Sequence, residues 1–328
     1  MGELQAVNGL QTIATWWMWA GFGVFIIAML SVDMLLLGRK GSHTVSAKEA
    51  LTWSLVWFTM ALLFGAGLWA WLDYSAGRAI ADTKVMEYLT GYLLEKTLAM
   101  DNIFVFVMIF SYFAVPQAFQ KRILLYGVLG AIILRAIMIA LGAWLITQFH
   151  WVLYIFGAFL LITGIKMFIF ADHEPNLARN PLLKWLKNHM RITEEYHGEK
   201  FWVMKNGVRW FTPMFLVLVL IELSDVIFAM DSIPAIFAIT SDPFIVFTSN
   251  IFAILGLRAL YFLLADMTNR FHLLKYGLAV VLVFVGAKML IVEWYKIPVA
   301  ISLAVVAAVL GTSIFLSILS THMQKVMH

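Results

Sequence analysis

The sequence predicts an all-α polytopic membrane protein with about nine transmembrane helices. Of its 328 residues, 62% are hydrophobic and only 13% are charged, about half the charged share that is usual in soluble proteins. Apolar stretches of roughly 20 residues, long enough to cross a bilayer as a helix, recur from one end of the chain to the other. Each stretch must be helical because the backbone finds no water in hydrocarbon. We therefore expect a single transmembrane domain over residues 1–328.

The apolar stretches give the expected limits of each span. They are Thr15–Leu37, Ala50–Leu72, Met86–Ser111, Ile123–Ile146, Trp151–Phe170, Pro213–Thr240, Pro243–Leu264, Leu273–Val292 and Val299–Leu319. Lys and Arg concentrate in alternate loops, and the opposite loops carry only Arg78, Lys84 and Lys296. The positive-inside rule then predicts an external N-terminus and a cytoplasmic C-terminus. The net charge of +4 is thus a topology signal, and no nucleic-acid partner is expected.

One cytoplasmic loop, 171–212, is long enough to have structure of its own. Residues 181–190 form the pattern of a short basic amphipathic helix, which we expect to lie on the anionic leaflet. Asn206-Gly207 stands between alternating apolar residues, which predicts a β-hairpin. The chain has no cysteine, which excludes disulfides, iron–sulfur clusters and thiolate metal sites.

The chain also repeats itself, with repeat one at 86–170 and repeat two at 213–292. Each copy contains an acidic residue four positions before an Ala-Met-Asp triplet. An Arg-Ala pair lies in the next span, and the third span begins at a tyrosine and ends with Gly-x-Lys-Met. They occur at Glu95 to Asn102, Arg135-Ala136 and Tyr154 to Met167, and again at Asp225 to Ser232, Arg258-Ala259 and Tyr276 to Met289. Each copy has three spans, spans 3–5 and 6–8, so the copies must have opposite topology. Such inverted repeats are typical of secondary transporters, although a duplicated protein that transports nothing is the alternative.

Ionisable residues inside the spans mark the expected site. The acids are Asp33, Glu95, Asp101, Glu222, Asp225 and Asp231, and the bases are Lys96, Arg135, Lys166, Arg258 and Lys288. Each charge at the bilayer centre costs at least ~2.5–3.5 kcal/mol, so it needs a partner or a function. Lys166 and Lys288 are near span ends and can extend to the interface, whereas Arg135 and Arg258 must find carboxylates.

Spacing groups these residues further. Glu95 and Asn102, like Asp225 and Ser232, are seven residues apart and share one helix face. Asp231 falls ~120° from Asp225, as does Asp101 from Glu95, so either the inward face is broad or the helices break there. Pro234 would free a carbonyl close to Asp231.

Clustered carboxylate, amide and hydroxyl oxygens suit Mg²⁺, Ca²⁺ or Mn²⁺. The expected metal ligands are Glu95, Asp101, Asn102, Glu222, Asp225, Asp231 and Ser232. Met100 and Met230 each precede an aspartate, and a thioether there would favour Mn²⁺, although packing is the commoner role of methionine. Internal salt bridges and a proton pathway are the alternative roles of the acids.

Both signatures resemble the paired motifs of the TerC family of integral membrane proteins, closest to its Alx branch. The resemblance includes Glu95 to Phe106, Glu222 to Ile239, Tyr126 to Gly130 and Thr248 to Arg258. It implies a bacterial inner-membrane protein linked to manganese export, often induced at alkaline pH, with an association with tellurium resistance. The family's function then carries over to the seven ligand positions named above, and Asp33 fits the family's acidic first span.

Two functions are expected from these observations. The first is a Mn²⁺ exporter that works by alternating access, coupled to protons, in which Arg135, Arg258, Lys96 and Asp33 balance charge. The second is a partner in membrane-protein assembly or metalation, with the cytoplasmic loop as its docking surface. We find no motif of a hydrolytic enzyme and expect neither enzymatic activity nor a bound cofactor. Other divalent cations and the oligomeric state stay open.

Overall fold

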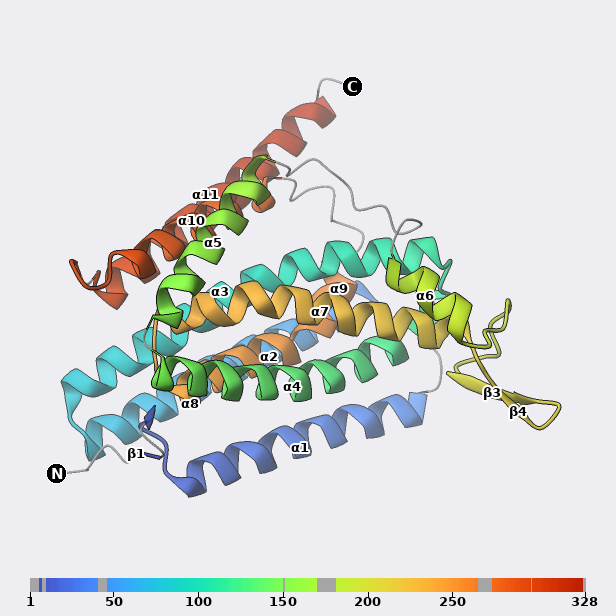
Figure 1. The fold of residues 1–328 in the computed structure, drawn as a ribbon, viewed down its shortest axis with the longest axis horizontal. Helices are drawn as coiled ribbons and strands as arrows, with labels where there is room; N and C mark the ends of the chain where they lie inside the picture. The colour runs from blue at the N-terminus through green and yellow to red at the C-terminus, as the bar shows by residue number, and fades with distance from the viewer. Residues whose placement is uncertain are drawn as a thin grey trace.

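The protein folds into a bundle of long helices with two short β-hairpins (Figure 1). The computed structural model describes residues 6–7, 10–40, 46–149, 151–169, 181–264, 273–295 and 297–326. Its helices are α1 (Trp16–Lys40), α2 (Ala47–Ser75), α3 (Arg78–Tyr112), α4 (Gln117–Gln148), α5 (Val152–Ile169), α6 (Pro181–His189), α7 (Pro213–Phe237), α8 (Pro243–Leu255), α9 (Leu257–Leu264), α10 (Leu274–Leu290) and α11 (Val299–Val326). Strands β1 (Ala6–Val7) and β2 (Leu10–Gln11) pair with each other, as do β3 (Trp202–Lys205) and β4 (Val208–Phe211).

The helices confirm an all-α polytopic membrane protein. Six helical segments of the described residues are long and apolar enough to cross a bilayer, and a shorter apolar segment lies in α1. They are Lys48–Ser75, Gln117–Gln148, Val152–Ile169, Pro213–Phe237, Pro243–Leu263 and Val299–Ser317. Helix α3 is longer than its predicted span because its polar first turns, Arg78 to Val85, continue the helix. A reading based on apolar runs leaves out such turns.

Two groups of helices differ in direction. Helices α1, α2, α3, α4, α7 and α8 run along one axis, whereas α5, α10 and α11 lie obliquely to it (Figure 1). Helix α3 packs on α2, α7, α8 and α11, and α7 packs on α4, so α3 and α7 are central to the bundle. Glycines bring α5 and α10 together: a Cβ on Gly286 would lie 2.8 Å from the Gly157 carbonyl oxygen.

Local signals set the ends of several helices. Ser46 caps α2 by accepting a hydrogen bond from the Glu49 amide, and Asp242 caps α8 by accepting one from the Phe244 amide. Pro213 and Pro243 occupy the first turns of α7 and α8, where a missing amide hydrogen costs nothing. Helix α7 continues through Pro234 to Phe237, so the break considered near Asp231 does not occur. The break lies instead at Gly256, between α8 and α9.

Residues 181–212 form a cap over one end of the bundle (Figure 1). The predicted hairpin is confirmed: β3 and β4 meet at Asn206 and Gly207, whose φ angles of 51° and 73° fit a type I′ turn. The predicted helix is present as α6, but its placement on lipid is wrong for the apolar face. Leu183 and Leu186 are buried in a core cluster with residues of α7, because that surface offers them apolar partners.

Candidate cation site inside the helix bundle

Arg135 of α4 occupies the centre of the bundle, and its side chain is 1% exposed. Its Nη2 donates to Asp225 Oδ1 at 2.8 Å and its Nε donates to Asp225 Oδ2 at 3.1 Å, a bidentate pair. Its Nη1 donates to Glu95 and, at 3.1 Å, to the Asn250 side-chain oxygen. One guanidinium therefore joins carboxylates from α3 and α7, the first helices of the two predicted repeat copies.

Polar side chains complete the cluster around Arg135. The Asn102 amide donates to Asp225 Oδ1 at 3.3 Å, and the Ser232 hydroxyl lies 3.4 Å from Arg135 Nη1. Among the described residues, Glu95 Oε2 and Asn102 Oδ1 are buried without a hydrogen-bond partner. Two buried oxygens thus keep free lone pairs, which is costly unless another donor or a cation binds there.

The cluster lies midway along its helices. Glu95 is the middle residue of α3 and Asp225 is the middle residue of α7. Glu95 and Asp225 are 1% and 2% exposed. Buried charges at this depth would be the most costly ones in a bilayer, and here they are paired.

Four residues lie on the helix faces that their seven-residue spacing predicted. Glu95 and Asn102 face the cluster from α3, and Asp225 and Ser232 face it from α7. Arg135 finds carboxylates, as its depth in the span required.

Two of the expected ligands lie elsewhere. Asp231 is partly buried beside the Thr163 hydroxyl of α5, on a different face of α7 from Asp225. Met230 is 50% exposed, so its thioether does not point into the cluster. The straight course of α7 explains both positions, because six residues turn a helix by ~600°, which leaves Asp231 ~120° from the face of Asp225.

Glu222 lies one turn before Asp225 on α7 and is partly buried. Its carboxylate packs against Gly130 of α4, where any Cβ would collide with it. It lies near enough to Asp225 for the two charges to interact. Glu222 therefore borders the cluster without belonging to the Arg135 network.

The side chains of Asp33, Met100 and Asp101 lie outside the described residues. Lys96 of α3 is partly buried, and its Nζ donates to the Ala253 carbonyl of α8 at 3.3 Å.

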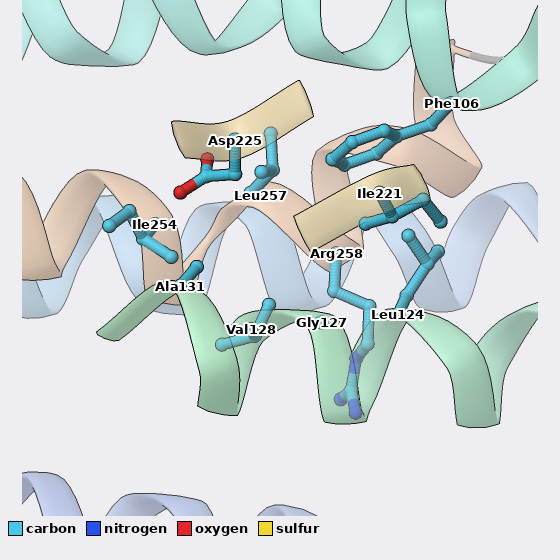
Figure 2. A pocket seen from close by; sticks show the side chains of 10 residues that line it. All are labelled: Phe106, Leu124, Gly127, Val128, Ala131, Ile221, Asp225, Ile254, Leu257 and Arg258. Atoms are coloured by element: carbon cyan, nitrogen blue, oxygen red, sulfur yellow. The ribbon is translucent and has the colours of Figure 1, made fainter. Parts of the chain in front are cut away.

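Arg258, the counterpart of Arg135 in the predicted repeat, lines a narrow cavity together with Asp225 (Figure 2). The cavity lies between α3, α4, α7 and the α8–α9 break, and apolar side chains such as Phe106, Leu124 and Ile221 form most of its wall. The Asp225 carboxylate and the Arg258 guanidinium point in different directions in Figure 2. Arg135 pairs with Glu95 and Asp225, and Arg258 lines the cavity next to Asp225.

Asn250, whose side-chain oxygen accepts a hydrogen bond from Arg135, is not among the predicted site residues. A signal was present, because Thr248-Ser249-Asn250 is a polar triplet inside an apolar span and all three residues are buried. The cost of burying polar groups applies to amides as well as to charges.

A second polar cluster, also missed, closes the end of the bundle opposite the cap. Asp242 at the start of α8 accepts from the Thr12 hydroxyl at 2.9 Å, and Glu87 of α3 accepts from the Thr240 hydroxyl at 2.6 Å. Lys84 lies 2.8 Å from Glu87 and 4.0 Å from Asp242, so it links the two carboxylates. These contacts join segments far apart in sequence, which no local pattern reveals.

Residues 80–325 match the model of the family described as "Integral membrane protein TerC family". The chain belongs to the TerC family. This TerC protein is 58% identical over 301 residues to proteins of Shigella flexneri and Escherichia coli (strain K12) named "Putative membrane-bound redox modulator Alx". Those alignments cover 92% of this chain and 94% of each relative. An uncharacterised membrane protein of Myxococcus xanthus is 47% identical over 304 residues, covering 93% of this chain and 92% of that protein. No solved structure matches the TerC protein.

Proposed function

We propose that this TerC protein exports divalent metal ions, with Mn²⁺ as the substrate, across the bacterial inner membrane by alternating access. One observation carries the proposal: a buried carboxylate pair from two central helices holds a guanidinium where a cation would bind. Glu95 and Asp225 together carry two negative charges and Arg135 carries one positive charge. The remaining negative charge and the unpartnered oxygens of Glu95 and Asn102 suit a hard cation.

Arg135 then acts as the internal substitute for the substrate. When Mn²⁺ arrives, it would take the oxygens of Glu95, Asp225, Asn102 and Ser232, and the guanidinium would withdraw. When the ion leaves, Arg135 returns and keeps the carboxylates paired while the empty carrier reorients. In the described conformation the Arg135 guanidinium is paired with both carboxylates. Protons offer the same compensation, because a protonated carboxylate needs no cation beside it, and proton coupling follows as part of the proposal.

The inverted repeat and the nine-span topology, with the N-terminus outside, belong to the same proposal. Helices α3 and α7 run in opposite directions in Figure 1, as an inverted repeat requires. The glycine contacts between α5 and α10 give independent support. A Cβ on Gly157 would meet the Gly286 carbonyl, and one on Gly164 would meet the Ala279 carbonyl. In the predicted repeat, Gly157 corresponds to Ala279 and Gly164 corresponds to Gly286. The contact of Gly157 with Gly286 in one direction therefore corresponds to the contact of Ala279 with Gly164 in the other, as a twofold axis requires.

Ion pairs link structural elements at both ends of the inferred path. Lys84, Glu87 and Asp242 link the helices at the end that we infer to be external. At the other end, the cap packs over the bundle, and Arg122 of α4 binds Glu199 of the cap at 2.9 Å. An alternating-access carrier needs contacts that can close each end of its path, because only one end may open at a time.

The relatives named as redox modulators fit this proposal indirectly. This chain contains no cysteine, so it has no thiol with which to exchange electrons. Exporting a transition metal would change the redox chemistry of a cell without any redox-active side chain in the exporter.

The experiment that tests export compares total cell manganese, measured by mass spectrometry, after a manganese challenge. Cells carry the wild type, Asp225→Asn, Glu95→Gln, Glu194→Gln or no protein. Glu194 is an exposed carboxylate of the cap and serves as the matched control. We expect low manganese with the wild type and Glu194→Gln, and the level of protein-free cells with the two site variants. Equal manganese in all five strains, with equal protein in the membrane, would refute export.

The cap favours a second candidate, a role in assembly or metalation of other membrane proteins. The hairpin β3–β4 projects from the bundle and exposes Trp202 (52%) and Met204 (65%) (Figure 1). Two apolar side chains exposed on one strand of a hairpin offer a candidate contact surface. The double variant Trp202→Ser/Met204→Ser tests this role. It leaves the fold of the cap intact, whereas removing the cap would also remove Leu183 and Leu186, which belong to the core. An exporter should tolerate the double change, whereas a docking protein should lose function.

A further inference from the structure

The break between α8 and α9 places a helix end in the interior of the bundle. Helix α8 ends at Leu255 and α9 begins at Leu257, within one apolar segment, Pro243–Leu263, that is long enough to span a membrane. The Gly256 amide turns back to the Ile254 carbonyl, and the Leu260 amide bonds to the Gly256 carbonyl. The end of a helix leaves carbonyl oxygens without intrahelical donors and carries the negative end of the helix dipole. Such an end attracts a cation.

Lys96 supplies that cation. Its Nζ donates to the Ala253 carbonyl in the last turn of α8, at 3.3 Å. Gly256 leaves the necessary space, because a Cβ there would collide with Lys96 Nζ. The side chain of Trp57 closes the other side, since the same Cβ would lie 3.3 Å from Trp57 Cβ. The ammonium therefore fits between α2, α3 and the broken helix.

No carboxylate of the described residues lies within 4.0 Å of Lys96 Nζ. This distinguishes Lys96 from Arg135 and Lys84, which are both paired with carboxylates. Among the described side chains and backbone atoms, the partner of Lys96 is the Ala253 carbonyl at the end of α8. Carbonyl oxygens alone, without a carboxylate, suit a single positive charge better than a divalent ion, which needs anionic ligands in a dry site.

We propose that the carbonyl end of α8 is a binding site for a small monovalent cation, and that the Lys96 ammonium is its tethered occupant. The site is separate from the carboxylate cluster that we assign to the divalent substrate. It has a positioning role, because α8 carries Asn250 and α9 carries Arg258. Occupancy of the site holds the broken helix against α3. The inference does not depend on transport of any ion.

Chemical rescue tests the proposal. Lys96→Ala, purified as the full-length protein in detergent, lacks the ammonium but keeps the site. We expect its apparent Tm to be below that of the wild type in choline chloride. Ammonium or methylammonium chloride at equal ionic strength should restore most of the loss, while leaving the wild type unchanged. Tetramethylammonium chloride, whose ion has no N–H to donate to the Ala253 carbonyl, should restore nothing.

The double variant Lys96→Ala/Gly256→Ala is the matched control, because the new Cβ at position 256 occupies the place of Nζ. Rescue by methylammonium should disappear in it. Equal responses of Lys96→Ala to methylammonium, tetramethylammonium and choline would overturn the proposal, as would rescue that persists in the double variant. If Lys96→Ala does not fold, Lys96→Gln decides. Its side chain is one bond shorter and carries an uncharged donor, so a Tm equal to that of the wild type would overturn the need for a cation.

Discussion

Replacement of Arg135 by alanine separates a cation site from a structural ion pair. The guanidinium holds two buried carboxylates, Glu95 and Asp225. Removing one partner of a buried ion pair costs about 3–5 kcal/mol, because the remaining charge stays unpaired and dry. We therefore expect Arg135→Ala to lower the free energy of unfolding by about that amount in metal-free buffer. The triple variant Arg135→Met/Glu95→Gln/Asp225→Asn should lose less, since it leaves no uncompensated charge.

Manganese should then reverse the effect if the carboxylates bind cations. A ligand that binds only the folded state stabilises it by ~2.7 kcal/mol at a free concentration of 100 times Kd. Most of the loss in Arg135→Ala should therefore return when Mn²⁺ replaces chelator. The assay is thermal unfolding in detergent, followed by the fluorescence of the 13 tryptophans. The triple variant should not respond to Mn²⁺. If Arg135→Ala is destabilised and Mn²⁺ does not raise its thermal stability, the cation site is refuted and the carboxylates with Arg135 form only a structural ion pair.

Three further changes have defined outcomes. Met230→Leu should leave manganese export unchanged, because the side chain is half exposed and away from the cluster; a loss of export would contradict this placement. Gly130→Ala should destabilise the protein by ~1–3 kcal/mol, as overpacking does, because its Cβ collides with the Glu222 carboxylate; unchanged thermal unfolding would show that the carboxylate moves freely. Burial raises the pKa of Tyr196 to about 12, and its hydroxyl donates to the Phe113 carbonyl. The neutral Tyr196 phenol stabilises the cap fully below pH ~10, the usual pKa of tyrosine. This stabilisation is lost as the pH rises through about 12. Hydrogen exchange of cap amides, after correction for the intrinsic exchange rate, should therefore increase more over that interval in the wild type than in Tyr196→Phe.

Helical spacing predicted part of the site because it is a property of a straight helix. Glu95 and Asn102 share a face of α3, and Asp225 and Ser232 share a face of α7, as the seven-residue interval requires. The cost of a buried charge likewise predicted that Arg135 pairs with carboxylates. Both features depend only on the geometry of one helix and on the cost of charge in the bilayer.

The rest of the site depends on which helices become neighbours. The surroundings of Asp231 depend on α5, which packs beside it with Thr163. The hydrogen bond between Glu87 and Thr240 joins residues 153 apart in the sequence. The break at Gly256 also escaped prediction, because a glycine inside an apolar run is compatible with a continuous helix. It becomes meaningful only once Lys96 Nζ is found in the space that glycine leaves.

Flux of Mn²⁺ through proteoliposomes tests the central claim most directly. Purified wild type, Asp225→Asn and Glu194→Gln are reconstituted at equal density, and Mn²⁺ movement is followed with a trapped fluorescent chelator. We predict rapid flux with the wild type and Glu194→Gln, and flux at the level of empty liposomes with Asp225→Asn. Flux through Asp225→Asn equal to that of the wild type would contradict the role of the buried carboxylate pair, and no flux above empty liposomes with any protein would contradict transport itself.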